Sequence, residues 1–223
     1  MSQVNPYNAL LLIDAADKKF TEAGRKDLFR DVASFLEEND PERIFNLCLV
    51  HRHFSLDPDK IMVADRKQDG NGETYYVTQP ELAGSPDVKP SAWTVDGFPF
   101  EWKRTFTGES VADAQALISK FKDTVKGLEV LGLCLAQDPL PDGEIWREYL
   151  HDKEKQQITK RYPRDGPWDD GGVYQTSWGV AAESGSDPAE VESGSEKAKT
   201  TLVFYQNCVC IQHAYEPEPE PIN

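Results

Sequence analysis

The chain has 223 residues and a formal net charge of -15 at pH 7. Its 39% hydrophobic and 28% charged residues are typical of a soluble protein that is long enough to bury a sizeable core. The acidic charge argues against nucleic acid and anionic membranes as partners, because both bind basic surfaces. No apolar run approaches the length of a membrane span. We therefore expect one soluble domain over residues 1–223.

The cellular setting is indicated by the first residues and by the cysteines. Residues 1–6 lack the basic patch and the small-residue cleavage site of a secretion signal. Four cysteines in a chain without such a signal are expected to be reduced thiols rather than a disulfide framework. We therefore expect a cytoplasmic protein.

The first half of the chain, 1–106, is predicted to contain helices followed by strands. Pro6 opens a short helix that runs towards Phe20, with a strand over 8–14 as the alternative. Apolar residues at helical spacing predict the next helix, and alternating apolar runs between turns predict the strands. These predictions are a helix over 21–39 and strands over 43–54, 61–64, 74–78, 91–95 and 99–106.

The second half, 107–215, resembles the first in the order of its elements. A helix that ends at Gly127 precedes an apolar strand, and the triplet Leu-Cys-Leu occurs at 47–49 and again at 133–135. The further strands are predicted over 144–150, 157–162, 173–180 and 201–213. We interpret the halves as two copies of a unit in which a helix is followed by antiparallel strands.

These elements predict an α+β fold. It would consist of mainly antiparallel, curved sheets with amphipathic helices packed on them. The acidic, Ser/Gly-rich stretch 183–199 and the Glu-Pro tail 216–223 have little to bury and are predicted to be disordered. A pocket at the junction of the two halves would be the natural place for function.

His51 and His53 are the strongest functional candidates. On a strand over 43–54 the two imidazoles would share one face with Leu47 and Leu49. Paired imidazoles on a strand can bind a divalent metal ion or act as a catalytic acid and base. The alternative is that both side chains face solvent or form ordinary hydrogen bonds.

Cys208 and Cys210 are the second group of candidate metal ligands. If their strand lay beside 43–54, the two thiols and the two imidazoles could form a two-His, two-Cys site for zinc, iron or copper. Another option joins the histidines to one carboxylate, Asp65 or Glu101, as a facial triad. The alternative for the cysteines is a place in the core.

Other catalytic groups have weaker signals. Arg52, between the histidines, could anchor an anionic group of a ligand, although pairing with surface acids is the alternative. A cysteine nucleophile has no local signature here. The sequence contains neither a Gly-x-Ser-x-Gly elbow nor a glycine-rich phosphate loop, which disfavours serine hydrolases and classical nucleotide-binding domains.

The helix followed by the strand Leu49-Val50-His51-Arg52-His53-Phe54 resembles hypothetical proteins of filamentous fungi. The resemblance covers the first third of the chain and the second Leu-Cys-Leu region. It implies a fungal source and a cytosolic setting, and it implies no activity.

The sequence thus favours an enzyme that acts on a small molecule, with or without a metal ion, and uses His51 and His53 as ligands or as acid and base. The alternative is a non-catalytic domain that binds a ligand, a metal or another protein. The expected partner is a small molecule, and the sequence leaves the oligomeric state open.

Overall fold

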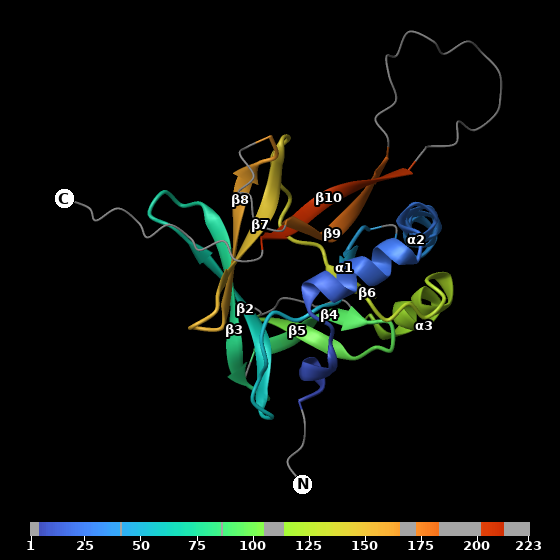
Figure 1. The fold of residues 1–223 in the computed structure, drawn as a ribbon. Helices are drawn as coiled ribbons and strands as arrows, with labels where there is room; N and C mark the ends of the chain where they lie inside the picture. The colour runs from blue at the N-terminus through green and yellow to red at the C-terminus, as the bar shows by residue number, and fades with distance from the viewer. Residues whose placement is uncertain are drawn as a thin grey trace, which may run out of the picture.

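The computed structural model describes residues 5–40, 42–85, 87–104, 114–165, 173–182 and 202–211. The stretch 183–199 and the tail 216–223, both predicted to be disordered, lie outside these residues. Figure 1 shows the strands arranged around an interior, with the α-helices gathered on one side. The elements are η1 (Pro6–Ala9), α1 (Ile13–Glu22), α2 (Arg25–Asn39), β1 (Phe45–Leu49), β2 (Lys60–Gln68), β3 (Thr74–Leu82), β4 (Val88–Thr94), β5 (Pro99–Arg104), α3 (Gln115–Thr124), β6 (Leu131–Leu135), β7 (Glu144–His151), β8 (Gln156–Pro163), β9 (Val173–Ala182) and β10 (Leu202–Ile211).

The strands form a closed barrel in the order β1-β6-β4-β5-β2-β3-β8-β7-β10-β9. β9 completes the ring by pairing with β1, where Leu47 lies opposite Trp178 and Cys48 opposite Ser177. Two pairs, β2–β5 and β7–β10, are parallel, and the other pairs are antiparallel. The predicted α+β class, with mainly antiparallel curved sheets and amphipathic helices packed on them, is therefore wrong: the protein is a mixed β-barrel. Closure gives each strand two neighbours and removes the free sheet edges, which strand patterns in a sequence do not reveal.

The ring has an internal symmetry. The strands β1–β5 can be exchanged one for one with β6–β10, so that β1 changes places with β6, β2 with β7, and so on. After this exchange every strand pair of the ring is again a strand pair, and the two parallel pairs, β2–β5 and β7–β10, are exchanged with each other. β1 and β6 lie side by side at the symmetry axis, with Leu47 opposite Leu133. The order is the one that two copies of a five-stranded unit would produce. The hypothesis that 1–106 and 107–215 are copies stays a prediction.

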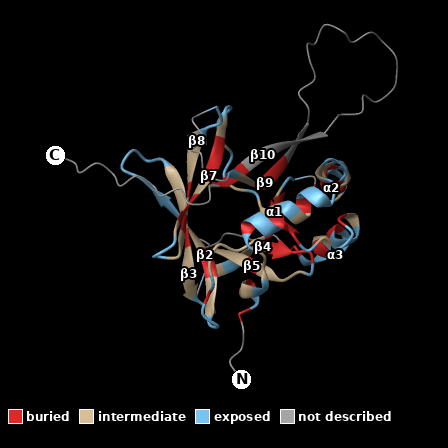
Figure 2. Cartoon of the chain, in the orientation of Figure 1, coloured by how far each residue is buried: buried red, intermediate tan, exposed pale blue. Residues whose placement is uncertain are grey.

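The α-helices cover the outside of the barrel with their apolar faces (Figure 2). Phe20 of α1, Val32 of α2 and Phe121 of α3 are fully buried in one cluster with Leu47 of β1 and Leu133 of β6. Such one-sided burial follows from the helical spacing of their apolar residues. The helix predicted over 21–39 begins later, at Arg25, because Gly24 adopts a left-handed conformation with φ +86.

Within the residues that the structure describes, no helix has both the length and the apolar character needed to cross a membrane.

Candidate metal centre

His51 and His53 lie just beyond β1 and not on it. The ladder ends where the Val50 N–H donates to the Val130 carbonyl (2.9 Å), and the chain then turns so that the Arg52 N–H donates to the Leu11 carbonyl (2.9 Å). The strand predicted over 43–54 is therefore too long. The expected shared face is found only in part: Leu47 packs under the helices, whereas His51 lines the barrel interior, and Leu49 contributes to both.

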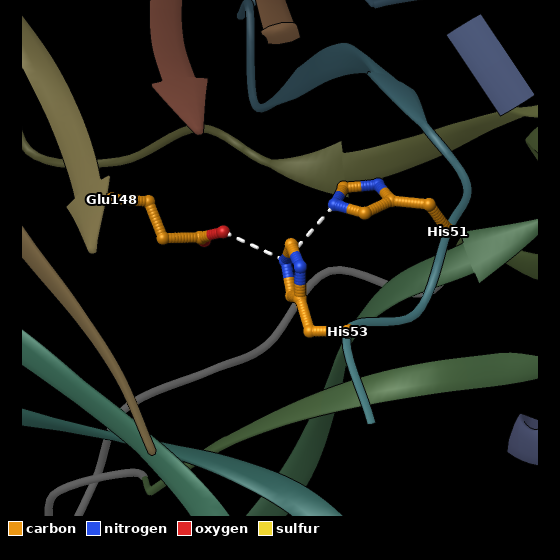
Figure 3. Close-up of side chains that lie close together, drawn as sticks. All are labelled: His51, His53 and Glu148. Atoms are coloured by element: carbon orange, nitrogen blue, oxygen red, sulfur yellow. Dashed lines mark hydrogen bonds and ion pairs between the residues drawn. The ribbon is translucent and has the colours of Figure 1, made fainter. Parts of the chain in front are cut away.

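The two imidazoles nevertheless converge (Figure 3). Nε2 of His51 lies 3.1 Å from Nε2 of His53, and the two rings are nearly perpendicular at 86°. Nδ1 of His51 donates to the Leu49 carbonyl oxygen at 2.7 Å. Since a carbonyl can only accept, this hydrogen bond places the proton on Nδ1 of a neutral His51. The lone pair of Nε2 is then directed at His53.

Glu148 of β7 completes the cluster from across the barrel. Its Oε1 atom lies 2.9 Å from Nε2 of His53, whose side chain is only 2% exposed. The two Nε2 atoms and one carboxylate oxygen all lie within 4.8 Å of one another. Oε1 is buried and has no hydrogen bond of good geometry. Three potential ligand atoms thus lie close enough together to bind one divalent ion.

The protonation states at the cluster suit metal binding. Burial, reinforced by the nearby His53 imidazole, lowers the pKa of His51 to about 4. Burial alone would raise the pKa of Glu148, but its polar contact with His53 prevails and lowers it. At neutral pH the cluster therefore offers a neutral imidazole and a carboxylate, the forms that bind metal ions.

The cluster borders a cavity of about 500 Å³ inside the barrel. His51 and Glu148 contribute to its wall, whereas His53, in contact with both, does not. A second carboxyl group, Glu101 of β5, also lines the cavity. Burial, together with the charge of Glu148, raises the pKa of Glu101 to about 8, so that this carboxyl group is protonated at neutral pH.

The predicted two-His, two-Cys site is not assembled. β10 pairs with β9 and β7, so β9 separates the cysteine strand from β1. Sγ of Cys210 lies 3.9 Å from Nε2 of His53. Cys208 lines the cavity. Among the residues described, the one group with metal-ligand geometry consists of His51, His53 and Glu148.

The cysteines are poor nucleophiles in this environment. Cys48, Cys208 and Cys210 are buried, and burial raises the pKa of each thiol well above its usual value. Because only the thiolate attacks, a protonated thiol is unreactive.

The remaining sequence candidates have other contacts. The Arg52 guanidinium donates from Nε to the Leu10 carbonyl at 2.9 Å, which fixes the N-terminal segment against the histidine loop. Asp65 accepts a hydrogen bond from Arg104 at 2.8 Å. Glu101, the other carboxylate considered for a triad, reaches the cavity but does not belong to the ligand group.

Glu148 is the potential ligand that sequence reasoning missed. It shares a strand face with Trp146 and Leu150, on a strand whose other residues are mostly buried. An acidic residue at an inward position of such a strand is costly unless it is paired or binds a metal. An acidic residue among the apolar residues of this strand was the signal in the sequence that could have identified Glu148 as a candidate.

Comparisons of the chain with protein families, curated proteins and solved structures find no match. Function is therefore inferred from the geometry of the site.

Proposed function

We propose that this protein is a metal-dependent enzyme that acts on a small molecule in the barrel cavity. His51, His53 and Glu148 hold the ion. The observation that carries the proposal is the convergence of the two Nε2 atoms and Oε1 within 4.8 Å, with the Leu49 carbonyl fixing the tautomer of His51. A hydrogen bond from the second ring nitrogen to a backbone carbonyl is the usual support of a metal-bound histidine.

The ligand types narrow the choice of ion. Two imidazoles and one carboxylate are found in catalytic zinc sites and in the facial triad of non-haem iron(II) enzymes. Blue-copper sites require a cysteine thiolate among the ligands, and the group of potential ligand atoms in the described residues consists of two imidazoles and a carboxylate. Zinc and iron(II) are therefore preferred over copper. Bound there, either ion would act as a Lewis acid and activate water or, for iron, oxygen.

Two residues beside the ion have supporting roles. The Cys210 thiol contacts Nε2 of His53 at 3.9 Å and helps to hold this imidazole in place. The protonated carboxyl group of Glu101 can donate a proton within the cavity. We place the enzyme in the cytosol, where its four free thiols would stay reduced.

Metal content tests the proposal directly. Protein purified without an affinity tag and analysed by plasma mass spectrometry is expected to contain about one zinc or iron per chain, or to take up one on dialysis. The double variant His51→Ala/His53→Ala should lose this ion. His151→Ala, on β7 but outside the ligand group, should keep it. Unchanged circular dichroism would show that the fold is intact. Metal-free wild-type protein that takes up no ion would overturn the proposal.

A second candidate is metal-free acid–base catalysis. It is favoured by the separation of pKa values between His51, at about 4, and Glu101, at about 8, since both side chains line one cavity. His51 would be the base and Glu101 the acid. This candidate requires a protein that binds neither zinc, iron(II) nor copper at micromolar concentration. The metal assay therefore separates metal-free catalysis from the metal-dependent enzyme.

A further inference from the structure

One row of side chains leads away from the metal ligands along the cavity wall. Glu148 of β7 lies directly opposite Thr159 of β8, and Thr159 lies opposite Tyr76 of β3. Residues directly opposite each other on neighbouring strands share a face of the sheet. All three side chains line the cavity. A molecule bound against Glu148 would therefore also contact Thr159 and Tyr76.

The same wall is rich in hydroxyl groups. Five serine and threonine side chains from four strands line the cavity: Thr78 (β3), Ser91 (β4), Thr159 (β8), Thr176 and Ser177 (β9). Thr78 is 7% and Thr159 4% exposed, and both side chains line the cavity. Because a hydroxyl group can donate and accept, each of them can hydrogen-bond to a polar ligand held there.

The charges around the cavity do not favour an anion. Nε of Arg66 donates to Asp138 at 3.0 Å, and Arg104 donates to both Asp65 and Glu81. The third basic residue of the lining, Lys103, is not free either. Among the described lining residues, a ligand carboxylate would therefore find no guanidinium or ammonium group without a partner, apart from a bound metal ion.

We propose that the substrate is an uncharged molecule with several hydroxyl or carbonyl groups, held by Thr78 and Thr159 with its reacting end at His51 and Glu148. The assignment of the reacting end rests on the proposed function. The substrate class does not depend on the proposed function, because it is inferred from the serine and threonine side chains of the cavity wall and from the partners of its basic residues. A cavity of about 500 Å³ is in the usual size range of small-molecule sites.

Two matched pairs of probes test the class. The first pair is D-glucose and D-glucuronate, and the second is benzene-1,3,5-triol and 2,4,6-trihydroxybenzoate. Each pair differs in one carboxylate. Calorimetric titration of the full chain, with and without added zinc, should show tighter binding of the uncharged member in at least one pair. The proposal is overturned if no uncharged probe binds, or if the anion binds as tightly in both pairs.

Threonine-to-valine variants test the contacts without changing the shape of the wall. Thr159→Val and Thr78→Val should each weaken binding of the uncharged probe by about threefold to tenfold, the effect of one lost hydrogen bond. Thr74→Val, on β3 but outside the lining, is the matched control and should bind normally. Normal binding by both cavity variants would overturn the proposal. The control for folding is thermal unfolding.

Metal analysis of the same samples separates this proposal from the proposed function. Thr159→Val and Thr78→Val should retain the metal content of the wild type, because neither residue is a ligand. Probe binding without metal would support the substrate class and count against the metal centre. Metal binding without any binding of uncharged probes would support the metal centre and contradict the substrate class.

Discussion

His53 and Glu148 come from opposite halves of the chain, yet Nε2 of one lies 2.9 Å from Oε1 of the other. His53 follows β1, and Glu148 lies on β7, which is separated from β1 in the ring by β10 and β9. Only closure of the barrel brings them together. The ligand group therefore depends on the fold as a whole, and its ligands should be lost together when the barrel opens.

Glu148→Gln should weaken metal binding while preserving the shape of the site. The amide has no negative charge, so the apparent affinity for zinc should fall at least about tenfold. A loss of about tenfold is the lower limit seen when a residue that hydrogen-bonds to a metal ligand is removed, and loss of a ligand itself should cost at least as much. Competition with a chromophoric chelator measures the affinity. Glu144→Gln, on the same strand but outside the ligand group, is the control. Equal affinity for zinc in E148Q and the wild type would contradict the assignment.

Glu101→Gln should change how stability depends on pH. The folded-state pKa of Glu101, about 8, is above the value of 4.5 expected in the unfolded chain. Its protonated form therefore stabilises the fold fully below pH 4.5, and this contribution is lost as the pH rises through 8. Relative to wild type, the metal-free variant should become progressively more stable between pH 5 and pH 9.

Urea unfolding of both metal-free proteins at pH 5, 7 and 9 measures this difference. Glu81→Gln, whose carboxylate is bound by Arg104 outside the cavity wall, serves as a contrast and should not reproduce the trend. A difference in unfolding free energy that is independent of pH would show that Glu101 is not held protonated.

Local patterns predicted most elements but not the barrel. The apolar alternation around Val63 and Ile145 and the helical spacing around Val32 mark their strands and helix correctly. A strand pattern, however, records which residues are buried and not which strands are neighbours. The pairing of Leu47 with Trp178, which closes the ring, joins β1 to a strand near the other end of the chain.

The candidate site was predicted in part for the same reason. His51 and His53 stand out by residue type, and the structure brings them together. Their direction could not be predicted, because the two-residue alternation ends where Val50 makes the last ladder bond. The apolar neighbours of Glu148 mark it as an unusual acid, but only the ring order places it beside His53.

Gly132→Ala should strongly destabilise the protein. A Cβ atom at Gly132 would lie 2.3 Å from the Trp93 carbonyl oxygen and 2.7 Å from Cγ2 of Val50, so the backbones of β6 and β4 would have to separate. We expect a loss of about 2–4 kcal/mol of unfolding free energy. Gly70→Ala, with no atom within 4 Å of its new Cβ, should lose far less. Similar urea midpoints for both variants would contradict this close packing of β6.

The four thiols should differ in reactivity. Cys134 is half-buried, whereas Cys48, Cys208 and Cys210 are buried, and burial raises their pKa values well above the usual range. Iodoacetamide at pH 7.5 should therefore label Cys134 first, and label the other three at a comparable rate only after unfolding in urea. Peptide mass spectrometry over time assigns the order. Rapid labelling of Cys208 or Cys210 in the folded protein would instead indicate an activated thiol, and would favour nucleophilic catalysis beside the proposed metal centre.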